Sequence, residues 1–254
     1  MHKFIWIGSL VSGVMLGLTP PGLGTQWLGL ISFFPLIYIL EQLHAKEELS
    51  FRKRAVMFFG ICWLSGGIAA SIGGYWITNS IHVFGHVPWL AAVIITGVGY
   101  GLEVGFQLFV YFGIPLLFIR KLNNWDLPLR LAFLLALDPL YPRLIQWNYG
   151  GLTFTEFPWI EQLADLIGSS GLLLYSAGLT FLLLGWWRWK TTGKLKLKIL
   201  LQATTIYLLL WVLGLSYGAW RLYNLETQDL EPNPQSSYLT VLVIQDRKST
   251  RLNS

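Results

Sequence analysis

Apolar residues gather along this chain in seven long runs, separated by short polar stretches. The runs cover residues 4–18, 27–40, 55–78, 88–119, 127–141, 163–187 and 199–220. An α-helix needs about 20 predominantly apolar residues to cross a bilayer. The pattern therefore predicts an all-α integral membrane bundle of about seven transmembrane helices.

The individual runs differ in length, and the differences predict local shape. The first two are short and are joined by Thr19-Pro20-Pro21-Gly22, which indicates a tight helical hairpin. The fourth is longer than one straight crossing, so we expect it to tilt or to kink near Pro115. The first run also has the basic start and apolar core of a secretory signal. No small-x-small cleavage site follows it, so we interpret it as an uncleaved span.

Composition supports a membrane protein. Of the 254 residues, 54% are hydrophobic and only 12% are charged, whereas a soluble domain carries about 25% charged residues. The single cysteine, Cys62, excludes an intramolecular disulfide and a CxxC metal site. The net charge of +5 does not indicate nucleic-acid binding, because the basic residues lie in the short gaps between apolar runs.

The basic residues in these gaps predict the orientation of the chain. If the N-terminus is cytoplasmic, the inside segments hold Lys3, Lys46, Arg52, Lys53, Arg54, Arg120, Lys121, Arg130, Arg188, Lys190, Lys194, Lys196 and Lys198. The outside segments then hold only Arg143 and Arg221. Because Lys and Arg are enriched in cytoplasmic loops, we expect a cytoplasmic N-terminus and an extracytoplasmic C-terminal end. This bias also supports the fifth run as a span.

The pattern changes after the seventh run. Residues 1–223 are predicted to form the membrane domain, and residues 224–237 form a polar linker that contains Pro232 and Pro234. Residues 238–245 are β-branched and apolar, which predicts the first strand of a soluble domain. Residues 246–254 resemble a translated sequencing adapter, and we expect them to be non-native. The rest of that soluble domain is expected to be missing.

Few polar residues fall inside the apolar runs. Glu103 lies in the middle of the fourth run, where an ionisable group is costly, so it is either a relay or substrate contact or a carboxyl group bonded to Gln107. Cys62 has no nearby base and is interpreted as a small buried hydrophobe. His82 and His86 are four residues apart in a predicted loop over 79–87, and we interpret them as polar loop residues rather than metal ligands. No metal or cofactor is expected.

Two further patterns concern packing and the membrane surface. Gly66, Gly67, Gly73 and Gly74 form a small-residue stripe that predicts close helix packing. The predicted outer loop over 138–162 is rich in aromatic residues, which form either an interfacial belt or a rim that admits a lipid-borne substrate. As a hypothesis, Trp76, Trp147, Tyr149 and Trp159 line this path for lipid.

Several blocks, in order, resemble the bacterial apolipoprotein N-acyltransferases. Residues 73–81 and 84–88 carry Tyr75-Trp76 and Phe84-Gly85-His86-Val87-Pro88, similar to the family's "YWxxxSI…FGxxP" block. Residues 141–150 resemble "FPxxxPWxxG", and residues 160–171 resemble "IQxADLxGxxG". Leu242-Val243-Ile244-Gln245 is similar to the strand that opens the family's nitrilase-type domain. The resemblance covers nearly all of residues 1–245.

The resemblance implies an enzyme of the inner membrane. Members of the family transfer an acyl chain from a phospholipid to the N-terminal amine of the diacylglyceryl-cysteine of a lipoprotein. The reaction passes through a thioester on a cysteine, with a glutamate base and a lysine that stabilises the oxyanion. These three residues belong to the nitrilase-type domain, so this chain is expected to hold no catalytic residue, to be inactive alone and to be a monomer.

Other classes remain open on the residues alone. A small seven-span transporter and a non-enzymatic membrane scaffold are the alternatives. The transporter is disfavoured because no inverted repeat is visible and few ionisable groups lie within the runs. A nitrilase-type enzyme with a different acyl acceptor is a third alternative.

Overall fold

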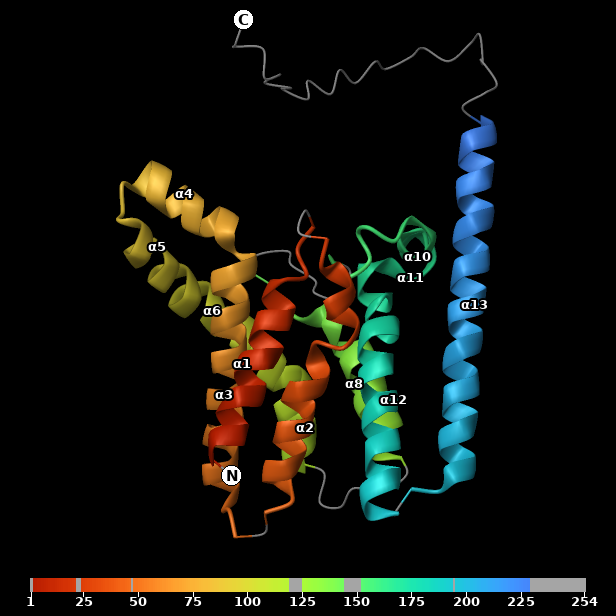
Figure 1. Ribbon diagram of the computed structural model, residues 1–254, viewed down its shortest axis with the longest axis horizontal. Coiled ribbons are helices and arrows are strands. Elements are labelled where there is room, and N and C mark those ends of the chain that lie inside the picture. The colour runs from red at the N-terminus through yellow and green to blue at the C-terminus, as the bar shows by residue number, and fades with distance from the viewer. Residues whose placement is uncertain are drawn as a thin grey trace, which may run out of the picture.

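The computed structural model describes residues 2–21, 24–46, 48–118, 125–143, 152–193 and 195–228, and all regular elements within these ranges are helical (Figure 1). In chain order they are α1 (His2–Gly17), η1 (Gln26–Leu30), α2 (Phe33–His44), α3 (Phe51–Gly73), α4 (Tyr75–Gly85), α5 (Trp89–Ile95), η2 (Thr96–Tyr100), α6 (Gly101–Leu108), η3 (Phe109–Gly113), α7 (Ile114–Phe118), α8 (Asp126–Leu137), η4 (Asp138–Leu140), α10 (Pro158–Glu161), α11 (Ala164–Gly171), α12 (Leu173–Thr192) and α13 (Leu197–Gln228). The predicted strand over 238–245 and the tail over 246–254 lie outside the described residues. Helix α13 reaches into the predicted linker.

The all-α membrane bundle is confirmed, whereas the number of seven spans is not. Among the described residues, four helical segments are long and apolar enough to cross a membrane: Gln26–His44, Phe51–Gly73, Trp89–Phe118 and Leu197–Leu225. A fifth is added if α11 and α12, which are bent by 55° relative to each other, count as one broken span. At a rise of 1.5 Å per residue, α1 is about 24 Å long and α8 is about 18 Å long, both less than the hydrocarbon core.

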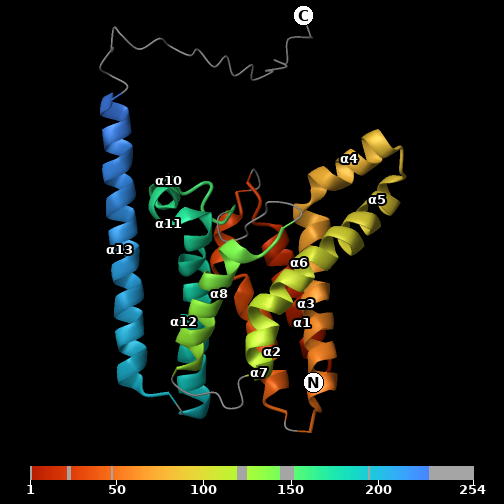
Figure 2. The ribbon, with the colours of Figure 1, turned by 180° about the vertical axis from the view of Figure 1, so that it is seen from behind.

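The predicted third span was wrong at its C-terminal end. Helix α3 stops at Gly73, and Gly74 separates it from α4, which forms with α5 a helical hairpin that projects from the bundle (Figures 1 and 2). The break depends on Gly74, because a Cβ there would collide with the carbonyl oxygen of Ala70. Thr78 then donates a hydrogen bond to Thr96 over 2.9 Å and ties the base of this hairpin together. The predicted loop over 79–87 is therefore helical as far as Gly85.

The predicted fourth span is helical from Trp89 to Phe118, and its irregularities are two π-helical turns. The first is η2, and the second, η3, ends at Gly113, two residues before Pro115. Proline cannot donate a backbone hydrogen bond, and its ring crowds the carbonyl group of residue i−4. That carbonyl belongs to Tyr111, inside η3, where the wider π turn leaves room for the ring.

The glycine stripe packs helices closely, as predicted. A Cβ at Gly101 would lie 2.6 Å from the Cα of Gly67, and one at Gly105 would lie 2.5 Å from the Cα of Trp63. These contacts hold α3 against α6. Gly73 packs in the same way, because a Cβ there would lie 3.1 Å from Pro20 in the turn between the first two helical segments.

One core unites most of the helices, and α13 stands at the edge. The main core joins α1, α2, α3, α6, α8 and α12. Helix α13 contributes Trp211 and Tyr217 to a second, smaller cluster around Phe154 and Tyr175. In both views α13 is the outermost helix of the bundle (Figures 1 and 2).

The two ends of the bundle differ in charge. The N-terminus and the α2–α3 and α12–α13 connections lie together at one end, which we call the basic end (Figure 1). Its described cations include Lys46, Arg52, Lys53, Arg54, Lys190, Lys196 and Lys198. The C-terminal end of α13 and the α4–α5 hairpin lie at the opposite end (Figure 1). The segments that the charge pattern placed on one side therefore do lie together.

Candidate functional site

Four charged side chains meet inside the bundle near the basic end. Glu41 of α2 accepts hydrogen bonds from Arg130 of α8 over 2.5 Å and from Nε of Arg188 of α12 over 2.9 Å. Nη1 of Arg188 also lies 2.9 Å from both carboxylate oxygens of Asp126, at the start of α8. We call these four residues the Glu41 cluster. It connects three helices that are far apart in the sequence.

The Glu41 cluster is almost completely buried. The exposed fraction is 5% for Glu41, 3% for Asp126, 1% for Arg130 and 8% for Arg188. Two carboxylates and two guanidinium groups balance in charge, and the bidentate geometry offsets part of the cost of removing them from water. Arg130 also lies over the ring of Phe181, with its Cζ 5.1 Å from the ring centroid. Because the network is buried and neutral, it is better suited to holding helices together than to binding a substrate.

Sequence reasoning missed this cluster. Arg130 and Arg188 were interpreted as loop cations that orient the spans, but both are buried within helices, and this is a correction. The available signals were Glu41 at the end of an apolar run and the spacing of four between Asp126 and Arg130. An ionisable residue inside an apolar run needs a partner, and each of these residues supplies one for another.

A second polar cluster lies toward the opposite end, where α8 continues into η4. Tyr111 donates a hydrogen bond to Oδ1 of Asp138 over 2.6 Å, and Arg143 forms a salt bridge with the same oxygen. Gln107 and Arg143 both donate to the Tyr111 hydroxyl, over 3.0 and 3.1 Å. We call these four residues the Asp138 cluster. Asp138 is buried, and the side chain of Arg143 is 10% exposed.

Arg143 is held in its charged form by this cluster. Burial acts to lower the pKa of Arg143, but the Asp138 carboxylate and the Tyr111 hydroxyl outweigh burial and raise the pKa above its ordinary value. The guanidinium group is thereby a permanent cation close to the surface at this end of the bundle. Its Nε has no hydrogen-bond partner among the described residues.

The residues that the sequence singled out for chemistry are dispersed. Cys62 is fully buried inside α3, consistent with its interpretation as a small hydrophobe. Gln107, the expected partner of Glu103, donates its amide to Tyr111. His82 lies in α4, with Nδ1 2.7 Å from the carbonyl oxygen of Val87, and His86 caps the same helix in a left-handed conformation. Across the described ranges, no three His, Cys, Asp or Glu side chains gather as metal ligands would.

The structure describes two of the four aromatic residues that are proposed to line a path for lipid. Trp147 and Tyr149 lie outside the described residues. Trp76 of α4 is 42% exposed and Trp159 of α10 is 54% exposed. Both helices lie at the opposite end, but on different sides of the bundle (Figures 1 and 2). The structure therefore does not bring Trp76 and Trp159 together.

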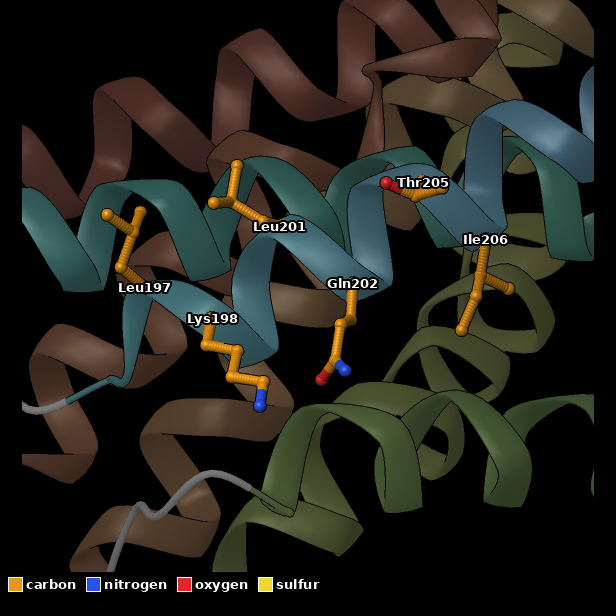
Figure 3. Close-up of a pocket in the computed structure, with 6 residues that line it drawn as sticks. All are labelled: Leu197, Lys198, Leu201, Gln202, Thr205 and Ile206. Atoms are coloured by element: carbon orange, nitrogen blue, oxygen red, sulfur yellow. The ribbon is translucent and has the colours of Figure 1, made fainter.

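One open depression on α13 does not form a binding cavity. Its lining residues, Leu197, Lys198, Leu201, Gln202, Thr205 and Ile206, all come from this single helix (Figure 3). One helix cannot enclose a ligand, because the other walls of a pocket are absent. We therefore assign no site to this surface.

Comparison with known proteins identifies similar sequences. The sequence profile described as "Apolipoprotein N-acyltransferase N-terminal domain" matches residues 12–179. An apolipoprotein N-acyltransferase of Bdellovibrio bacteriovorus is 28% identical over 248 residues. The match covers 89% of this chain and 40% of that relative. No solved structure matches.

Proposed function

The chain belongs to the family of the apolipoprotein N-acyltransferase N-terminal domain, and we propose that it forms the membrane part of such an enzyme. The reaction would transfer an acyl chain from a phospholipid to the N-terminal amine of a diacylglyceryl-cysteine on a lipoprotein. The observation that carries the proposal is the profile match, which runs from α1 into α12. It favours the acyltransferase over a small transporter or a scaffold.

We propose that the catalytic residues follow α13 in a nitrilase-type domain. The chain spans 40% of the length of the Bdellovibrio bacteriovorus relative, which leaves room for such a domain. Three residues of this chain that match catalytic residue types are poorly placed. Cys62 is buried, Glu103 lies within α6, and Lys53 lies at the basic end. A thioester route would then use a cysteine, a glutamate base and a lysine from the following domain.

The membrane part would hold that domain against the lipid surface. Helix α13 ends at the opposite end of the bundle from the N-terminus (Figure 1). With a cytoplasmic N-terminus in the inner membrane, a domain after α13 would face the outer leaflet. Both substrates are anchored in that leaflet, so confining the enzyme there replaces a search in three dimensions by close proximity. We propose that the protein works as a monomer.

An acyl-transfer assay tests this function. The chain alone and the chain extended through its own downstream coding sequence are each mixed with phosphatidylethanolamine and a diacylglyceryl lipopeptide. Mass spectrometry then measures the triacylated product. We expect product only with the extended chain. Turnover by the chain alone would contradict the assignment of catalysis to the following domain, and no turnover by a folded extended chain would contradict the function.

The proposed path for lipid has its own test in the extended chain. Trp76, Trp147, Tyr149 and Trp159 are each replaced by alanine, with Trp220→Ala as the control, since Trp220 is an exposed tryptophan on α13. We expect a higher KM for the phospholipid in the four variants and no change in the control. An unchanged KM in all four would contradict the proposal.

A further inference from the structure

An apolar groove of about 290 Å³ runs between α8, α12 and α13. Its floor is a stripe of α12 that includes Leu174, Gly178, Phe181 and Gly185. The two glycines let neighbouring helices approach. A Cβ at Gly178 would lie 3.0 Å from the ring of Tyr207, and one at Gly185 would lie 3.1 Å from Leu200. From Leu174 to Gly185 the floor is about 16 Å long at 1.5 Å per residue.

The groove has one charged residue, and it lies at the basic end. Lys196 lines the groove beside Leu195, just before α13 begins. Its side chain is exposed. All other lining side chains are apolar, apart from Tyr207, whose hydroxyl bonds the carbonyl oxygen of Tyr175. The groove is thus a long apolar slot with a cation at one end.

We propose that this groove binds one acyl chain of an anionic phospholipid from the leaflet at the basic end, with the phosphate near Lys196. The volume lies at the lower limit for ligand sites, which suits one chain rather than two. An apolar slot in a membrane bundle is filled by lipid, and the cation selects an anionic headgroup over a neutral one. Bound in this way, the lipid fills the space between α13 and the rest of the bundle.

This lipid is distinct from the acyl donor of the proposed reaction. The donor is expected in the leaflet at the opposite end, near the domain that follows α13. The groove extends toward that end as far as Leu174 and Leu210, whereas Lys196 lies at the basic end. The groove and Lys196 do not depend on the proposed reaction, so this lipid site would remain if the proposed function were wrong.

Native mass spectrometry of the purified chain in detergent measures the binding of phosphatidylglycerol against phosphatidylcholine. We expect phosphatidylglycerol to be retained in preference. The variant Lys196→Gln should weaken this preference by about fivefold, the effect of one cation near an anionic lipid. The control Lys190→Gln removes another exposed cation at the same end that does not line the groove, and it should retain the preference.

A second variant pair tests the groove itself. Ala203→Trp places a large ring in the groove from an exposed position of α13, whereas Leu208→Trp places one outside the groove on the same helix. We expect only Ala203→Trp to lose the bound phosphatidylglycerol. Equal retention by both variants would overturn the proposal.

A photoactivatable phosphatidylglycerol, with the reactive group on its acyl chain, gives an independent map. We expect cross-links to Leu182, Ala203 and Ile206, which line the groove. Cross-links spread evenly over the lipid-facing residues of α3 and α6 would show ordinary bilayer contact and overturn the site. If Ala203→Trp fails to fold, the cross-linking map and the comparison of Lys196→Gln with Lys190→Gln still test the proposed site.

Discussion

The Glu41 cluster and the Asp138 cluster are both built from buried charges, but they hold the bundle in different ways. The Glu41 cluster joins α2, α8 and α12 through four charged groups, each almost fully buried. The Asp138 cluster joins η3 to η4 and to Arg143, which follows η4 and supplies the cation of this cluster. The first cluster lies between three helices, and the second secures the end of one of them, α8.

The difference indicates which end of the protein is fixed. At the basic end, removing the Glu41 carboxylate leaves two buried guanidinium groups to share the Asp126 carboxylate. At the opposite end, removing the Asp138 carboxylate affects one guanidinium group, that of Arg143. We infer that the basic end is the rigid base of the domain.

The largest expected effect is that of Glu41→Gln. The amide keeps the shape of the side chain but removes the charge that both Arg130 and Arg188 contact. Leaving buried charges unpaired costs about 3–5 kcal/mol. Unfolding titrated with SDS and followed by tryptophan fluorescence measures this loss. The matched control is Glu48→Gln at the same end, since Glu48 is exposed, and it should change the free energy of unfolding little.

A smaller effect is expected for Asp138→Asn. The asparagine oxygen still accepts a hydrogen bond from Tyr111, but the charge that pairs with Arg143 is lost. Because Asp138 pairs with one guanidinium group whereas Glu41 pairs with two, we expect a loss of about 1–3 kcal/mol in the same titration. A loss as large as that of Glu41→Gln would break the distinction between the two clusters.

The smallest effect is expected for Arg221→Gln. Arg221 of α13 lies 3.2 Å from Asp165 of α11, and the two side chains are 36% and 52% exposed. Exposed ion pairs contribute about 0–1 kcal/mol and are screened by salt. Unfolding at low and at high salt should therefore show a small difference from the unmodified chain that disappears at high salt. A larger, salt-independent loss would mean that this exposed pair at the opposite end also holds α11 and α13 together.

The helical content of the bundle could be predicted from the sequence, but of its interruptions only an irregularity near Pro115 could. The seven apolar runs all contain helices, because a long apolar run in a membrane has to satisfy its backbone within itself. The break at Gly74 depends on its close contact with the Ala70 carbonyl four residues earlier, which hydropathy does not reveal. The π-helical turns η2 and η3 also leave no trace in hydropathy.

The polar clusters, too, could be predicted from the sequence only in part. Arg130 and Arg188 were recognised as basic residues at one end, but a count of charges cannot tell a loop cation from a buried one. Their burial depends on Glu41, which lies 89 and 147 residues away in the chain. Such pairing is set by how α2, α8 and α12 pack, and the sequence pattern does not encode it.

The most direct test of the account is the coding sequence downstream of Tyr238 in the source DNA. If this chain is the membrane part of an N-acyltransferase, the reading frame should continue past Gln245 for about 200 residues or more, the size of one domain. That domain should be of the nitrilase type and contain a glutamate, a lysine and a cysteine. A stop near Gln245 in the natural DNA would contradict the account and leave a membrane protein without its proposed catalytic domain.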